Sequence, residues 1–138
     1  MRGHSRMSNT AETLWDKARE ALHPARHDLP VSAEAAASRA CYAAFYAVSA
    51  HFALQDRTFK KHTTLEAAVH RDLVRAGLWP KDLGEGFSRL VKLRYKGDYV
   101  TTERVAPADA ERAIQIASRI LKTVADGNPT AFHGLFEL

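Results

Sequence analysis

Cysteine is almost absent from the 138-residue chain, and no long apolar run occurs. A single cysteine, Cys41, excludes an internal disulfide framework and a zinc site built from several cysteines. The longest stretch without a formal charge, from Ala40 to Gln55, contains tyrosines and a histidine and is shorter than the ~20 residues needed to cross a bilayer. The start of the chain, Met1 to Met7, has no apolar core of a signal peptide. We therefore expect a reduced, cytoplasmic protein without a membrane segment.

Neither sign of charge is in large excess, because the chain has 20 Lys and Arg residues and 16 Asp and Glu residues. The small positive excess permits attraction to phosphate, but an ordinary solvated surface explains it equally well. The length and the 46% apolar fraction are typical of one folded domain. We expect a flexible N-terminus over residues 1–8, a helical bundle over 9–125 and a tail over 126–138. The apolar tail segment Phe132–Phe136 either docks on the bundle or contacts a partner.

Apolar residues recur at helical spacing in five segments, without strand alternation, an internal repeat or a glycine-rich phosphate loop. The first helix is predicted to begin at Asn9, in a capping box with Glu12, and to stop at Pro24. The second is predicted to open near Ser32 and to run to about Gln55. It is rich in alanine and apolar nearly all round, which places it at the centre of a bundle.

The remaining three helices have recognisable ends. The third is predicted to open with a capping box between Thr63 and Glu66 and to stop at Gly77. Pro80 starts the fourth, and Pro107 suits the first turn of the fifth. The sequence therefore predicts an all-α fold, an antiparallel bundle of four or five helices.

Two opposite charges occupy core positions late in the fourth helix. Continuing the apolar seam of Phe87, Leu90 and Val91 by one turn reaches Arg94, and four further residues reach Asp98. Because burying either charge alone is costly, they should pair with each other or face a groove or a second subunit. One interpretation is a purely structural ion pair. The other is a polar cleft in which Arg94 holds a phosphate.

Arg39 poses the same question in the second helix. It shares a helical face with Tyr42 and Tyr46, where it could meet a carboxylate such as Asp98 or a nucleotide phosphate. The alternative is an arginine that lies along the surface.

His62, Glu66 and His70 follow one another at i,i+4 spacing in the third helix. Two such steps span ~12 Å, too far for one ion, so only adjacent pairs could chelate a metal. A solvated polar face is favoured, and we expect no metal and no cofactor.

Three motifs in register resemble the HEPN domain family, especially its short stand-alone bacterial and archaeal members. Ser38–Tyr46 is similar to the S-R-x-Y-Y-A-x-F signature of the second helix, and Lys61-His62-Thr63 to the K-x-H-type opening of the third. Leu93–Tyr99 is similar to the L-R-x-x-x-D-Y ending of the fourth. The resemblance covers about Leu14 to Val124. It implies an antiparallel helical bundle, often dimeric, associated with RNA or nucleotides, whose relatives include toxins and partners of a minimal nucleotidyltransferase.

The same resemblance bears on catalysis, because active HEPN ribonucleases carry R-x(4–6)-H. Arg94 matches the arginine, but Tyr99, Val100 and Thr101 stand where the histidine is expected. Tyrosine is a poor general base at neutral pH. We therefore expect a non-enzymatic module with a degenerate nuclease motif, a homodimer that binds RNA, a nucleotide or a nucleotidyltransferase-type partner in a toxin–antitoxin-like context. Its ligand site would consist of Arg39, Tyr42, Tyr46, Arg94, Asp98 and Tyr99.

Two alternatives remain open. The first is an active, metal-independent HEPN ribonuclease toxin, in which Arg94 stabilises the transition state and Asp98, Tyr99 or His62 moves protons. The second is a purely structural helical adaptor that binds only protein.

Overall fold

The computed structural model describes residues 6–99 and 105–132, with side chains for all of these except 6–8 and 95–99. It consists of helices α1 (Arg6–Asp28), α2 (Ala33–Ala53), α3 (His62–Ala68), α4 (Lys81–Tyr99) and α5 (Pro107–Gly127), and α3 continues as a π-helical stretch, η1 (Val69–Val74). The described residues contain no strand, which confirms the predicted all-α fold.

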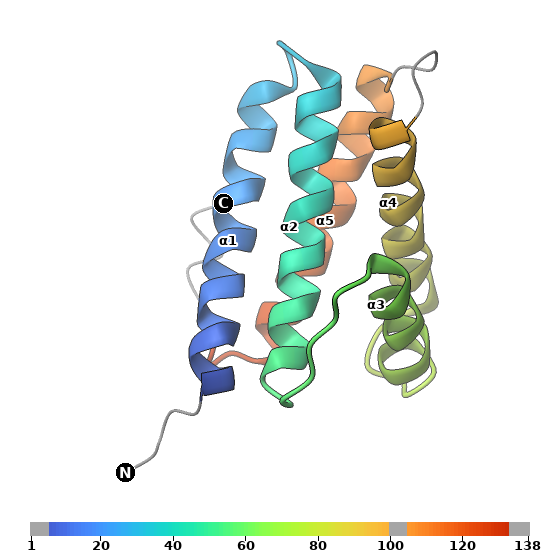
Figure 1. Ribbon diagram of the computed structural model, residues 1–138. Coiled ribbons are helices and arrows are strands. Elements are labelled where there is room, and N and C mark those ends of the chain that lie inside the picture. The colour runs from blue at the N-terminus through green and yellow to red at the C-terminus, as the bar shows by residue number, and fades with distance from the viewer. Residues whose placement is uncertain (1–5, 100–104, 133–138) are drawn as a thin grey trace.

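Successive long helices run in opposite directions, as the predicted antiparallel bundle requires (Figure 1). The helix α2 contacts each of the other three long helices, most extensively α1 and α5, and α3 with η1 lies beside α4. None of the helices in the described ranges is both long enough and apolar enough to span a membrane.

Alanine explains how α2 fits at the centre of the bundle. Its buried residues lie on several sides of the helix and include Ala36, Ala40, Ala43 and Ala47. Fully buried alanines also recur on α1, at positions 11, 18 and 25. Because methyl side chains keep neighbouring backbones close, α1 and α2 pack along their whole length.

The first helix continues through a proline. Pro24 is predicted to stop it, but α1 runs on to Asp28, so that prediction is wrong. A proline in a helix interior removes one backbone hydrogen bond and costs about 3 kcal/mol. The side chains of Leu22 and Ala25, on either side of Pro24, are fully buried in the core. Their burial offsets this cost and keeps the last turn on α2.

The start of α2 near Ser32 follows the prediction, whereas the capping boxes predicted at α1 and α3 are not formed. The Ser32 hydroxyl oxygen accepts a hydrogen bond from the backbone N–H of Ala35 at 3.1 Å. Asn9 lies inside α1 and Thr63 inside α3, so the two predicted capping boxes are wrong. The third helix begins at His62, because the ring of this residue packs against a phenylalanine of α2 and belongs to the first turn.

A glycine lets α4 approach η1 closely. A Cβ atom at Gly84 would lie 2.5 Å from Val74 Cγ2, which ordinary packing excludes, and 3.3 Å from His70 Cε1, which is a tight contact. The sequence predicts a regular α-helix up to Gly77, but residues 69–74 are π-helical. Gly77 then ends the segment with a left-handed φ of 84°.

The chain docks on the bundle after α5. Phe132 is 1% exposed, and its ring stacks on Trp15 of α1 with the centroids 4.9 Å apart. The beginning of the apolar tail therefore packs on its own bundle, and the rest of the tail lies outside the described residues.

Candidate functional site

Arg94 lies where α4 meets α2, in contact with Tyr42. Its guanidinium donates a hydrogen bond to the Tyr42 hydroxyl, and Cζ lies 4.3 Å from the centroid of the ring. A hydrogen bond and a cation–π contact together hold the two side chains in one arrangement. Arg94 also lines a small cavity of about 90 Å³, with Leu93 and Val105 among its neighbours.

The backbone of α4 continues past Arg94 to its last residue, Tyr99, so Asp98 follows one turn later. The side chains of Asp98 and Tyr99 lie outside the described residues. Their places in the ligand site, and the ion pair between Arg94 and Asp98, stay predictions.

Arg39 is turned away from this junction. Its Nε donates a hydrogen bond to Asp28 Oδ2 at 2.6 Å, and its side chain is 50% exposed. The sequence suggests a carboxylate such as Asp98, or a phosphate, as the partner of Arg39. The partner is instead Asp28, because α1 continues beyond Pro24 and carries this carboxylate to α2. The structure brings Tyr42 and Arg94 together and leaves Arg39 apart from them.

Tyr42 and Tyr46 contribute to a larger hollow of about 270 Å³, which we call the aromatic pocket. The two rings stack with centroids 6.0 Å apart and an interplanar angle of 24°. The ring of Phe45 packs on that of His62, with centroids 4.1 Å apart. The wall of the aromatic pocket includes Tyr42, Phe45 and Tyr46 of α2, Phe59, Lys60 and Lys61 of the α2–α3 segment, and His62 of α3.

Three lysines surround the aromatic rings. Lys60 and Lys61 are exposed at the wall of the aromatic pocket, and Lys17 Nζ lies 5.7 Å from the ring centroid of Tyr46. None of the three forms an ion pair with a carboxylate whose side chain is described. Stacking surfaces beside uncompensated positive charge can take up a base on the rings and its phosphate on the cations.

An ion-pair cluster holds the α2–α3 segment in place. The Arg57 guanidinium donates a hydrogen bond to Asp72 Oδ2 at 2.8 Å and lies over the rings of Phe52 and Phe59. Arg71 donates two further hydrogen bonds to the same carboxyl group, each of 3.0 Å. The hydrogen bonds from Arg71 and then Arg57 lower the pKa of Asp72 to about 2, so its charge persists at neutral pH. The cluster therefore fixes Phe59 as part of the pocket wall.

The sequence marks Tyr42, Tyr46 and His62 as candidate site residues but none of the three lysines, although Lys61 belongs to the motif that opens the third helix. The signal for two of them was present in the segment from Arg57 to His62, where a phenylalanine is interleaved with basic residues. Such a pattern indicates a ligand surface only when aromatic side chains lie beside it, and the packing of the helices determines whether they do. Lys17 gave no signal, because it is an ordinary exposed position of α1.

The two histidines at metal-ligand spacing in the third helix contact different residues. His62 packs on Phe45, and His70 Nε2 hydrogen-bonds to Ser88 Oγ of α4 at 2.7 Å. Across the residues with described side chains, no group of three histidine, cysteine or acidic side chains is arranged to hold a metal ion.

Comparison with known proteins identifies relatives of this bundle. The UPF0332 protein of Thermotoga maritima is 39% identical over 64 residues, which are 46% of this chain and 48% of the relative, so the match spans about half of that protein. The crystal structure of TT1696 from Thermus thermophilus superposes with a TM-score of 0.71 at 24% identity, over 86% of this chain and 98% of that one. The likeness to TT1696 concerns the fold.

The family model of the HEPN domain matches residues 11–127, from the first turns of α1 to the end of α5. This range includes the aromatic pocket and the Tyr42–Arg94 contact. The three sequence motifs and the bundle agree with that match, and the chain belongs to the HEPN domain family.

Proposed function

We propose that the protein is a binding module that takes up a nucleotide, or a short single-stranded segment of RNA, in the aromatic pocket. The observation that carries the proposal is the stacked pair of Tyr42 and Tyr46 with three lysines around it and no described carboxylate paired to them. Membership of the HEPN family supports it, since this helical module is often associated with nucleases or toxins.

The size of the pocket favours one unpaired base over a duplex. The volume of about 270 Å³ is slightly below that of typical ligand pockets, which measure about 300–1,000 Å³. Bases in a duplex are stacked on each other and cannot reach a tyrosine ring, whereas unpaired bases can. Each base that stacks on an aromatic side chain contributes about 1–3 kcal/mol.

The first test removes one stacking surface. We expect Tyr46→Leu to weaken the binding of a labelled single-stranded RNA of about eight nucleotides on the order of tenfold, because leucine fills space but offers no ring. Fluorescence anisotropy measures the change. Tyr46 is the better target than Tyr42, whose hydroxyl also holds Arg94. Unchanged affinity in Tyr46→Leu would place the RNA elsewhere.

The second test separates the pocket lysines from general surface charge. Lys60→Ala and Lys61→Ala should each weaken binding and reduce the slope of log affinity against log salt by about 0.7 for a single strand. Lys122→Ala is the matched control, because Lys122 lies on α5, is 69% exposed and does not line the aromatic pocket. If all three variants lose affinity equally, the attraction is diffuse and the pocket is not the site.

We further propose that the protein acts as a homodimer and has a nucleotidyltransferase-type partner, in a toxin–antitoxin-like setting. HEPN domains commonly dimerise, which supports the first part. Light scattering on the purified protein should give twice the mass of the chain. Co-expression with a small nucleotidyltransferase encoded next to it should yield a complex. A protein that is monomeric and does not bind the nucleotidyltransferase would refute this proposal.

A ribonuclease is the second candidate, because Tyr42 links Arg94 to the pocket that contains His62. In that case Arg94 would stabilise the negative charge that develops on the phosphate, and His62 would move a proton. Incubating labelled RNA with the protein in a chelator distinguishes the two functions. A binding module leaves the RNA intact, whereas cleavage that disappears in Arg94→Ala would establish the enzyme.

A further inference from the structure

At the contact between α4 and α5, charged residues recur at an interval of seven residues on each helix. At one level, Arg119 of α5 makes two hydrogen bonds to the carboxyl group of Asp82 of α4, at 2.7 and 3.2 Å. Seven residues after Asp82 stands Arg89, and seven residues before Arg119 stands Arg112. Because the helices are antiparallel, a step of seven residues along both leads from the Asp82–Arg119 pair to Arg89 and Arg112, which are both arginines.

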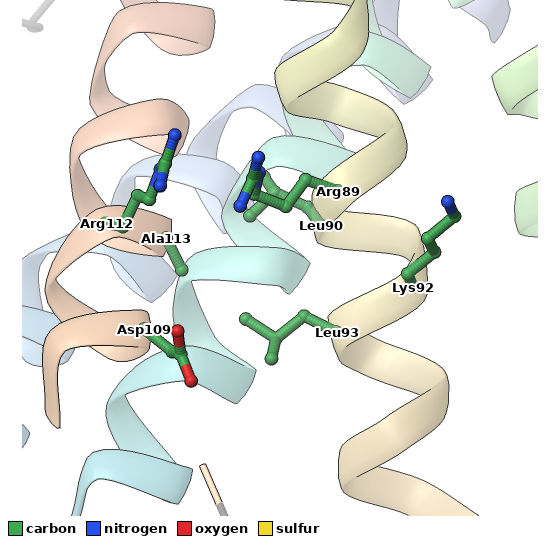
Figure 2. A pocket seen from close by; sticks show the side chains of 7 residues that line it. All are labelled: Arg89, Leu90, Lys92, Leu93, Asp109, Arg112 and Ala113. Carbon is green, nitrogen blue, oxygen red and sulfur yellow. The ribbon is translucent and has the colours of Figure 1, made fainter. Parts of the chain in front are cut away.

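The two arginines line one cleft of about 200 Å³ between the helices. Figure 2 shows the guanidinium groups of Arg89 and Arg112 extending into this space, one from each helix. Leu90, Leu93 and Ala113 also line the cleft, and Figure 2 shows Leu93 and Ala113 below the guanidinium groups, with the carboxylate of Asp109 at the level of Leu93. The cleft therefore has guanidinium groups at one level, and apolar side chains together with one carboxylate at the next.

No described carboxylate neutralises these arginines. Neither Arg89 nor Arg112 forms an ion pair within the part of the chain whose side chains are described. Asp109 lines the cleft without reaching ion-pair distance of either guanidinium, and the ammonium group of Lys92, another lining residue, points away from the two arginines (Figure 2). Glu85, one turn before Arg89, makes no ion pair with it either. Two guanidinium groups in one cleft repel each other unless an anion lies between them.

We propose that the α4–α5 cleft binds the phosphate group of a small organic phosphate. A guanidinium fork matches two phosphate oxygens, and one fork from each helix suits a group with oxygens on several sides. A phosphate monoester carries about two negative charges on one group, whereas a peptide carboxylate carries one. The organic part of the ligand would lie on Leu93 and Ala113. The cleft shares no lining residue with the aromatic pocket, so this site is independent of the RNA site proposed above.

The test uses phosphates without a base, which cannot stack in the aromatic pocket. We expect isothermal titration calorimetry at constant ionic strength to detect binding of inorganic pyrophosphate and ribose 5-phosphate but not of ribose. Arg89→Gln and Arg112→Gln should each weaken this binding on the order of tenfold. Arg75→Gln is the matched control, since Arg75 is exposed, has the same charge and lines neither site. Tyr46→Leu should leave pyrophosphate binding unchanged.

Two further variants separate charge from geometry and guard against a failure to fold. Arg112→Lys keeps the positive charge but removes the fork, and it should also bind pyrophosphate more weakly. Arg112→Glu should place a carboxylate beside Arg89 and so form an ion pair like that between Asp82 and Arg119. It should melt at a higher temperature than wild type without added anion, and pyrophosphate should raise the melting temperature of wild type only.

The competing ligands define what would overturn the proposal. Equal binding of pyrophosphate by wild type, Arg89→Gln, Arg112→Gln and Arg75→Gln would show diffuse surface charge instead of a site. No binding by wild type, or tighter binding of hexaglutamate than of pyrophosphate, would also refute it. A dinucleoside monophosphate that competes with ribose 5-phosphate would support a phosphate cleft and identify the RNA backbone as the source of the group.

Discussion

Replacing Gly84 by alanine tests how closely α4 packs on η1. Alanine is the better helix former by about 1 kcal/mol, so an unobstructed position would become more stable. The new Cβ would lie 2.5 Å from Val74 Cγ2 and 3.3 Å from His70 Cε1. Valine strongly prefers one χ1 rotamer in a helix, so moving its methyl group away by rotation about χ1 also costs free energy. Overpacking of this kind costs about 1–3 kcal/mol, and we expect Gly84→Ala to lower the free energy of unfolding by up to about 2 kcal/mol.

A double-mutant cycle isolates the steric term. In the Val74→Ala background the obstructing methyl group is gone, and Gly84→Ala should then stabilise the protein by about 1 kcal/mol. The coupling between the two positions is therefore about 1–3 kcal/mol. Gly86→Ala provides a graded comparison, because its Cβ would lie 3.0 Å from Cγ2 of the longer, partly buried Ile116. The change in the free energy of unfolding caused by Gly86→Ala should lie between the changes that Gly84→Ala causes in wild type and in the Val74→Ala background.

Urea unfolding, followed by circular dichroism, measures all four proteins of the cycle and the Gly86→Ala variant. The midpoint should shift without a change in slope if the native packing alone is altered. The reasoning fails if Gly84→Ala stabilises wild type as much as it stabilises Val74→Ala. The close approach of α4 to η1 would then be absent in solution.

Three other predictions concern the tail, a buried histidine and the wall of the aromatic pocket. Phe132→Ala should lower the free energy of unfolding by about 3–5 kcal/mol, because the ring is buried on Trp15; a loss well below 1 kcal/mol in urea unfolding would contradict the docked tail. Burial, with a smaller effect of Arg57, lowers the pKa of His51 below 6.5. The folded state therefore binds fewer protons than the unfolded state just below that pH, and stability should fall as the pH falls from 6.5; urea midpoints should show a flatter profile in His51→Gln. Asp72→Asn should release the α2–α3 segment, so that trypsin cleaves it faster than in wild type; equal cleavage rates would show that the ion-pair cluster does not hold the wall.

Local sequence signals predicted most of the helical architecture. The alanine-rich second helix, its start near Ser32 and the proline at the start of α5 follow from side-chain volume, hydrogen bonding and a fixed φ angle. These properties act within a few residues of the chain, so they need no knowledge of the fold. The arginine at position 94 was conspicuous for the same reason, because it breaks the apolar period of its own helix.

Longer-range packing overrode the local signals at three places. Pro24 fails to end α1, since the burial of its neighbours Leu22 and Ala25 offsets the lost hydrogen bond. His62 starts α3 ahead of Thr63, since its ring packs on α2. No periodic pattern in the sequence predicted the π-helical geometry of η1, whose residues His70 and Val74 lie next to Gly84.

Both candidate sites join residues from different helices, and this explains what each level of structure contributes. Tyr42 and Arg94 each stand out in the chain, but only the bundle sets the guanidinium over the ring. Arg89 and Arg112 resemble ordinary surface arginines until the antiparallel packing of α4 and α5 places them in one cleft. Secondary structure arises from the chemistry of neighbouring residues, whereas a binding site depends on distances between segments that are remote in the chain, and those distances exist only once the helices have packed.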